Sequence, residues 1–169
     1  HIMPRRISER PTKDMQVEIM DLGALISKMR AQVDRDRSGN VTFAPIPEVP
    51  TRINGQMLKL VMTAPIVLGS NYEDKIKTIL RKTARDIIDP RSYRYRIASV
   101  LLENPGLERD EIAAALQVSV STANRELDDM RLVNMIDIEV KRRVQNQGRK
   151  FHAFSLNPEI TQQLRRLDV

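Results

Sequence analysis

The first half of the chain carries apolar residues at helical spacing. Between Asp14 and Val33 they recur every three or four positions, which predicts an amphipathic helix over about 14–33. The segment 34–50 that follows contains a Ser-Gly-Asn turn and three prolines, so an extended connection is expected there. Within this connection, residues 41–43 (Val-Thr-Phe) are the candidate for a short strand.

Two further helices are expected before residue 90. Thr51 stands where an N-cap residue belongs, and an apolar face follows it. Pro65 should end or kink this helix near Ala64, because proline lacks the backbone N–H that a helix uses. The next helix is expected over 72–88 and is stopped by an Asp-Pro pair. These helices carry no recognisable chemistry, so they are interpreted as a helical bundle or flank. The apolar face after Thr51 is expected to hold Ile53, Met57, Leu58, Leu60 and Val61.

After Pro90 the pattern predicts three short helices. They are expected over about 91–103, 109–116 and 120–132, with a turn at 117–119 between the last two. Helices joined by so short a turn cross steeply, so the residues at their crossing must be small or apolar. The residues expected at the crossing are Ile112, Leu116, Val118, Ala123, Leu127 and Met130.

The start of the helix over 120–132 carries candidate binding residues. The outward-facing side chains there are short and polar, with one arginine and one methyl-bearing side chain, and such a set suits base edges in the major groove and flanking phosphates. A serine precedes the helix and is expected to cap it. Glu126, Asp128 and Asp129 weaken the attraction of this helix for phosphate. The candidate DNA-binding residues are Ser119, Val120, Ser121, Thr122, Asn124 and Arg125.

A β-hairpin is expected after these helices. Residues 135–140 alternate between apolar and acidic side chains, as a half-buried strand should, and 151–156 is the expected return strand. The Asn-Gln-Gly sequence at 146–148 supplies the turn. An Asn-Pro pair then ends the second strand before a last helix over about 159–167.

Positive charge is concentrated at the tip of this hairpin. No acidic residue lies between Val140 and Ala153, and five basic residues do, against a net charge of +6 for the chain. Charge gathered at a hairpin tip is expected for contact with phosphates or with the minor groove. The candidate residues are Lys141, Arg142, Arg143, Arg149 and Lys150.

Residues 91–169 resemble the winged helix-turn-helix superfamily of DNA-binding domains. The stretch EIAAALQVSVSTANRELDDMRLV is similar to the core of MarR-like and GntR-like regulators. The resemblance implies a recognition helix in the major groove and a basic wing on the DNA backbone. Winged helices also serve as protein docking modules, so a protein-protein interaction module without nucleic acid stays open.

A fainter resemblance covers 45–90, which looks like the helical lid of AAA+ ATPases related to MCM helicases. In that family a proline-rich approach leads to a helix that opens with a sensor-2 arginine, followed by an apolar stretch. Here the arginine would be Arg52 and the stretch 56–60 (QMLKL). The phosphate loop G-x-x-x-x-G-K-[ST] occurs nowhere in the chain, so the chain by itself lacks a cradle for nucleotide phosphates. The alternative to a sensor-2 role is that Arg52 is an ordinary solvent-exposed residue in the first turn of its helix.

Composition narrows the classes of function. Hydrophobic residues make up 41% of the 169 residues and aromatics only 4%, which favours packed helices over a β-sandwich. The absence of cysteine excludes disulfides and thiolate zinc sites. His152 is expected to pack rather than bind a metal, and the spaced acids of 34–39 lack the downstream glutamate of a calcium loop. No catalytic constellation is found, so we expect no enzyme and no cofactor.

The sequence therefore predicts a mainly α fold in three parts. Residues 1–13 are interpreted as a tag remnant and tail, 14–90 as the helical region, and 91–169 as the winged helix. We expect binding to double-stranded DNA by a cytoplasmic, nucleoid-associated protein with no membrane segment. The alternatives are a transcriptional regulator, and a lid-plus-winged-helix piece of a replicative ATPase that works in a ring. A homo-oligomer stays open, with 14–90 as a dimerisation bundle, but no heptad-like seam persists long enough to name an interface, which favours a monomer slightly.

Overall fold

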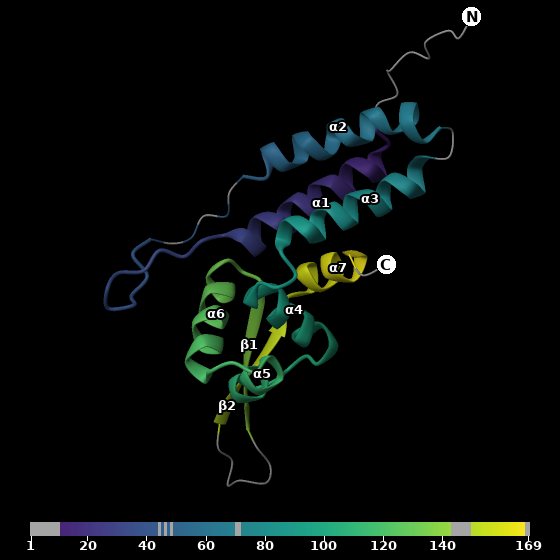
Figure 1. The fold of residues 1–169 in the computed structure, drawn as a ribbon. Coiled ribbons are helices and arrows are strands. Elements are labelled where there is room, and N and C mark those ends of the chain that lie inside the picture. Colours follow the sequence, from purple (N-terminus) through teal and green to yellow (C-terminus); the bar gives the residue numbers. More distant parts are fainter. Residues whose placement is uncertain are drawn as a thin grey trace, which may run out of the picture.

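The computed structural model describes residues 11–43, 45, 47, 49–69, 72–142 and 150–167. Within these residues the chain forms seven helices and one two-stranded antiparallel sheet, so the fold is mainly helical, as expected (Figure 1). The helices are α1 (Lys13–Arg30), α2 (Thr51–Leu68), α3 (Tyr72–Ile88), α4 (Tyr93–Glu103), α5 (Arg109–Leu116), α6 (Val120–Leu132) and α7 (Pro158–Leu167). The strands are β1 (Ile136–Arg142) and β2 (Lys150–Leu156).

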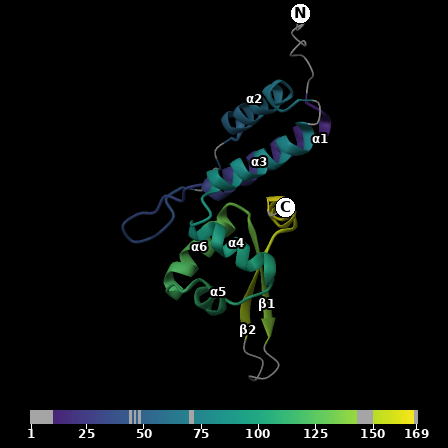
Figure 2. The same ribbon diagram turned by 45° about the vertical axis from the view of Figure 1, so that its right-hand side comes forward.

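Three long helices form one end of the molecule. Figures 1 and 2 show α1, α2 and α3 side by side, with α2 farthest from the rest of the chain. The apolar face of α1 is buried at Leu25 and Ile26, which have no exposed surface. Gly23 lets α2 come close, because a Cβ atom at this position would lie 1.8 Å from Oδ1 of Asn54. A small residue on α1 therefore fixes how α2 packs.

The first helix is shorter than the apolar pattern predicts. It was expected to reach Val33 and ends at Arg30. The guanidinium of Arg94, on α4, donates from Nη1 to the carbonyl oxygens of Lys28, Met29 and Ala31 at 2.9, 3.1 and 2.7 Å. These carbonyls lie at the C-terminus of α1, where backbone donors are scarce, and the carbonyl of Lys28 also accepts from the backbone N–H of Ala31 at 3.4 Å. A tertiary contact thus ends α1.

One expectation for α2 is wrong, and of the two effects expected at Pro65 one does not occur. Thr51 is the first helical residue rather than the N-cap, which is Pro50, and no side chain caps this end. Pro65 does not end the helix, which continues to Leu68. The fixed φ of proline is compatible with a helix, although Pro65 removes the hydrogen bond that its nitrogen would have donated to Val61 and its ring crowds the carbonyl of that residue. The packing of Leu68 against the core favours the additional turn.

The expected apolar face of α2 is divided between core and solvent. Met57 and Val61 are 1% and 2% exposed, whereas Leu58 and Leu60 are 38% and 41% exposed. Around the helix the four side chains spread over an arc of about 160°, with Met57 and Val61 at its centre and Leu58 and Leu60 at its two edges, so only the central pair faces the core.

The other end of the molecule contains α4, α5, α6 and the hairpin of β1 and β2. The bounds of α5 and α6 agree with the sequence pattern, and α4 begins at Tyr93 after the capping residue Ser92. The strands pair antiparallel, with Ile136 opposite Leu156 and Arg142 opposite Lys150. The expected turn at 146–148 lies outside the described residues.

The loop between α1 and α2 contains no strand element within its described residues. The expected strand at 41–43 is reduced to a single bridge between Val41 and Arg35. Asp36 organises this loop, because its Oδ1 accepts from the backbone N–H groups of Ser38 and Asn40 at 2.8 and 2.9 Å. The backbone N–H groups of the turn thus donate to the side chain of Asp36 rather than to a neighbouring strand.

The last helix, α7, joins the two ends of the molecule. Asn157 caps it, since its Oδ1 accepts from the N–H of Ile160 at 2.9 Å. Lys28 of α1 pairs with Glu159 at 3.3 Å, and Arg166 pairs with Asp21 of α1. One continuous cluster of buried apolar side chains extends from α1 to α7. Among the helices of the described residues, none has the length and apolar character needed to cross a bilayer.

Candidate nucleic-acid interface

Helices α5 and α6 cross through the apolar residues that the sequence indicates. Val118, in the turn, is half-buried against the same core. The rest of the expected set is at most 4% exposed, so the two helices are in close contact. The residues buried at the crossing are Ile112, Leu116, Ala123, Leu127 and Met130.

The turn between α5 and α6 is held by its own backbone and by Arg96. Gln117 adopts the left-handed conformation with φ 57°, and the N–H of Val118 donates to the carbonyl of Ala113 at 3.0 Å. Nη2 of Arg96, on α4, donates to the carbonyl of Leu116 at 2.8 Å. The Arg96 guanidinium also lies 5.9 Å from the centre of the Tyr93 ring. The direction in which α6 leaves the turn is therefore fixed from α4.

Ser119 caps α6, which confirms the sequence prediction. Its Oγ accepts from the N–H of Thr122 at 3.1 Å. The same Oγ lies 2.8 Å from the hydroxyls of both Ser121 and Thr122. The three hydroxyl groups therefore form one hydrogen-bonded cluster at the N-terminus of α6, where backbone N–H groups attract anions.

The expected outward set on α6 is only partly exposed. Val120 is 45% exposed, and Ser121 and Arg125 are also exposed. Thr122 and Asn124 are half-buried. The side chains that reach solvent thus lie in the first turn and a half of the helix.

Of the three acidic residues of α6, one is buried, one contacts Arg125 and the third, Asp128, is half-buried. Asp129 is buried and pairs with Arg35 from the loop after α1. The Glu126 side chain is 16% exposed, and its Oε1 lies 3.5 Å from Nη2 of Arg125. Burial lowers the pKa of Arg94, while the nearby charges of Glu126 and Asp129 raise it and so favour the cation. The three arginines together offset much of the negative charge of α6.

At the hairpin, the described basic residues are Lys141, Arg142 and Lys150. All three are exposed, and Arg142 and Lys150 occupy paired positions at the end of the sheet. Nζ of Lys141 lies 3.4 Å from Oε2 of Glu139, so part of its charge is balanced within β1. The other two candidates, Arg143 and Arg149, lie outside the described residues.

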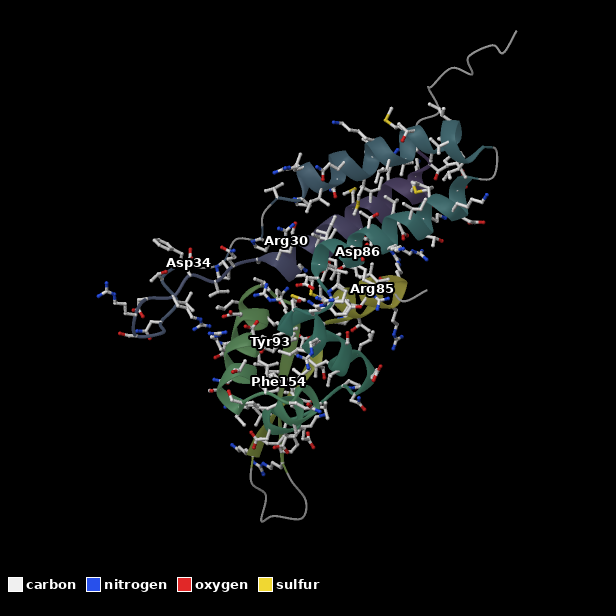
Figure 3. The ribbon with its side chains drawn as sticks, in the orientation of Figure 1. Arg30, Asp34, Arg85, Asp86, Tyr93 and Phe154 are labelled. Atoms are coloured by element: carbon white, nitrogen blue, oxygen red, sulfur yellow. The ribbon has the colours of Figure 1, made fainter. Side chains whose placement is uncertain are left out.

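A short segment between α4 and α5 adds a third partner to the sheet. The N–H of Gly106 donates to the carbonyl of Phe154 at 2.8 Å, and the N–H of Phe154 donates to the carbonyl of Leu107 at 2.9 Å. Figure 3 labels Phe154 in the middle of this end of the molecule. The hairpin is thereby anchored to the helices beside it.

Arg52 is separate from the other candidates. It is exposed in the first turn of α2. Figures 1 and 2 place α2 and the hairpin at opposite ends of the molecule. The structure therefore brings Arg52 close to neither the α6 face nor the hairpin.

Sequence reasoning missed Arg35, Arg94 and Arg96. Arg35 and Asp129 are separated by 94 residues, so no local pattern connects them. Arg94 and Arg96 lie on a short helix among tyrosines and apolar residues, and that unusual position was the available signal. Within the part of the chain that the structure describes, no group of three His, Cys, Asp or Glu side chains is placed to bind a metal ion.

No protein-family model matches this chain, and neither a curated protein nor a solved structure is significantly similar to it.

Proposed function

We propose that this chain binds double-stranded DNA through a winged helix-turn-helix. In this proposal α6 lies in the major groove and the hairpin of β1 and β2 is the wing on the DNA backbone. The observation that carries the proposal is the face of α6. Its first turn and a half exposes Ser121 and Arg125 beside a cluster of hydroxyl groups, while Asp129, one helical turn beyond Arg125, is buried and paired with Arg35.

The order of the elements supports the same proposal. α4 is followed by the short segment that pairs with Phe154, then by α5, the turn, α6 and the hairpin. This is the order of a winged helix, with the segment at Leu107 as the short third strand. The contact between Arg96 and Leu116 holds the end of α5 against α4, and the buried apolar residues at the crossing hold α6 against α5, which supports a rigid binding surface.

The chemistry of the exposed side chains suits phosphates and base edges. The guanidinium of Arg125 either pairs with two acceptors of guanine or clamps a phosphate. The hydroxyls at the start of α6 are donors beside a helix N-terminus, which favours a phosphate oxygen. Arg142 and Lys150, at the end of the sheet, would continue the contact along the backbone.

The wing is tested by the dependence of DNA affinity on salt. Replacing Arg142, Arg143 and Arg149 with alanine should weaken binding to all duplexes alike. The slope of log K against log salt should flatten by about 0.9 for each phosphate that the protein no longer neutralises, because fewer counterions are released. Fluorescence anisotropy at several salt concentrations measures both quantities.

Arg52→Ala is the matched control, since Arg52 is exposed and far from the hairpin. It should leave the slope unchanged. An unchanged slope in the triple variant would mean that the hairpin does not lie on the DNA backbone. A protein that binds no duplex at low salt would refute the proposal as a whole.

A second candidate function is protein-protein contact through α2. Leu58, Met62 and Ile66 follow one another by four residues and are 38%, 41% and 63% exposed. This spacing places them on one face of the helix, away from the buried Met57 and Val61. A continuous apolar stripe on the outermost helix favours contact with another protein surface. Such contact is compatible with a dimeric transcriptional regulator and with a lid that packs within an ATPase ring.

A further inference from the structure

A surface cleft between α3 and α7 brings three arginines together. It has a volume of about 590 Å³. Leu156 and Pro158 supply its apolar part, and Thr161 and Gln162 add polar groups. The arginines come from two helices that are far apart in sequence and in contact in the fold. They are Arg81, Arg165 and Arg166.

Two of these arginines are oriented by carboxylates of α1. Nε of Arg81 donates to Oε1 of Glu18 at 2.7 Å, and Nη1 of Arg166 pairs with Asp21. Each ion pair uses one nitrogen of its guanidinium. Within the described residues no other hydrogen bond occupies the remaining N–H groups of either arginine. Each guanidinium is thus held in position with free donors.

Arg165 gives the cleft an unbalanced positive charge. Glu18 and Asp21 offset the charges of Arg81 and Arg166, whereas Arg165 is exposed and has no ion-pair partner in the part of the chain that the structure describes. Figure 3 labels Arg85, one helical turn beyond Arg81, where α3 approaches α7. The electrostatic field in the cleft therefore favours an anion.

We propose that this cleft binds a small molecule that carries a phosphate or diphosphate group. The planar fork of N–H donors on arginine matches phosphate oxygens two at a time. The volume falls within the range of about 300–1,000 Å³ that small-molecule sites occupy. Leu156 and Pro158 offer apolar surface to the remainder of such a ligand.

The position of the cleft makes this proposal independent of DNA binding by α6. Figures 1 and 2 both show α6 and α7 on opposite sides of α4. A duplex bound along α6 would therefore leave the cleft open. The ligand would contact α3 and α7 together, and so bridge the helical end and the hairpin end of the molecule.

Titration of the full chain with pyrophosphate, followed by amide NMR, tests the site. We expect saturable shifts that include the amides of Thr161 and Gln162. Arg165→Gln should weaken binding by about tenfold, the effect of losing one charge-assisted hydrogen bond. The side chain of Arg165 is exposed and unpartnered within the described residues, so this variant should fold normally. Arg52→Gln, which removes the same charge from α2, should bind as the unchanged protein does.

Three results would overturn the proposal. One is the absence of saturable shifts, and another is equal weakening in the Arg165→Gln and Arg52→Gln variants, which would indicate a nonspecific charge effect. The third comes from a labelled duplex. If Arg165→Gln weakens duplex binding while pyrophosphate does not bind, the cleft contacts the DNA backbone instead. Failure of DNA binding by α6 would leave the pyrophosphate result unaffected.

Discussion

Arginine side chains on α4 complete two other helices. Arg94 supplies donors to the last carbonyls of α1, and Arg96 supplies one to the last carbonyl of α5. Helix C-termini leave carbonyl groups without backbone donors, so each arginine adds donors to those of the local backbone caps at Ala31 and Gln117. Both contacts also connect separate elements, since Arg94 joins α4 to the end of α1 and Arg96 joins α4 to the end of α5.

Arg94→Met should lower the free energy of unfolding by about 2 kcal/mol, because three carbonyls lose a charged donor while the apolar stem is kept. Urea unfolding followed by circular dichroism measures the change. Arg91→Met is the control, since Arg91 is exposed just before the same helix, and it should be close to neutral. Equal stabilities of the two variants would show that the capping contacts of Arg94 contribute nothing.

Asp36 should make the loop after α1 sensitive to acid. Hydrogen bonds from Asn40, Ser38 and Gly39 outweigh desolvation and hold the pKa of Asp36 below its ordinary value. A lowered pKa stabilises the folded turn above the unfolded value, and this contribution is lost as the pH falls through the folded value. The amide shifts of Ser38 and Asn40 should therefore titrate with a midpoint below the ordinary pKa of an aspartate. A midpoint at or above the ordinary aspartate value would contradict this account.

Local chemistry predicts some caps correctly and others wrongly. Ser119 was correctly identified because a serine directly precedes a short amphipathic run and a tight turn. Thr51 was misassigned by one residue, because the chain enters α2 already at Pro50 and packs there against Gly23. The difference is that the first cap depends on neighbouring residues and the second on a tertiary contact.

Among the helices, those bounded by strong local signals were predicted best. α5 and α6 agree with their expected bounds, since a left-handed residue and a serine cap separate them. α2 was predicted less well. Its apolar residues exceed what one buried face accommodates, and only packing decides that Met57 is buried and Leu58 is exposed. Helical periodicity predicted which residues at the start of α6 are candidates for binding. It did not predict the ion pairs that Glu126 and Asp129 form.

Replacement of Arg125 tests whether α6 reads bases or binds the DNA backbone in the proposed complex. If Arg125 reads a base, Arg125→Ala should lower affinity for a selected site by about 1–3 kcal/mol and relax preference at one position. If it clamps a phosphate, affinity should fall for all duplexes and the salt slope should decrease by about one unit. The contact with Glu126 leaves the Arg125 side chain 59% exposed, so we expect the phosphate role. Selection from a random duplex library with both proteins gives the answer, and enrichment of one sequence that disappears only in the variant would favour base reading.

Across the chain as a whole, ion pairs and a continuous core join the helical end to the hairpin end. Arg35 contacts α6, and Lys28 and Asp21 of α1 contact α7. Exposed pairs contribute little to stability, but Asp129 is buried, so its pairing with Arg35 matters for the position of α6. The sequence predicted the elements on both sides of this junction. The ion pairs that join the two ends could not be predicted, because the residues of each pair are far apart in sequence.

The apolar stripe of α2, formed by Leu58, Met62 and Ile66, leads us to expect self-association. The sequence favoured a monomer because no heptad seam is present. However, Leu58, Met62 and Ile66 leave an apolar face uncovered within the described residues. Burial of such side chains stabilises contacts by about 1.5–3 kcal/mol each when it is complete. We therefore expect the full chain to self-associate with rising concentration. Replacement of Met62 and Ile66 by lysine should weaken the association by at least about tenfold.

Sedimentation velocity over a range of concentrations measures this association. Val140→Lys is the matched control, because Val140 is 56% exposed on the hairpin, far from α2, and its replacement should leave association unchanged. A chain that sediments as a monomer at every concentration would contradict self-association through α2. Equal weakening by both changes would attribute the effect to added charge rather than to the stripe. Because α2 and the hairpin lie at opposite ends, the Met62 and Ile66 changes should also leave DNA affinity per chain unaltered.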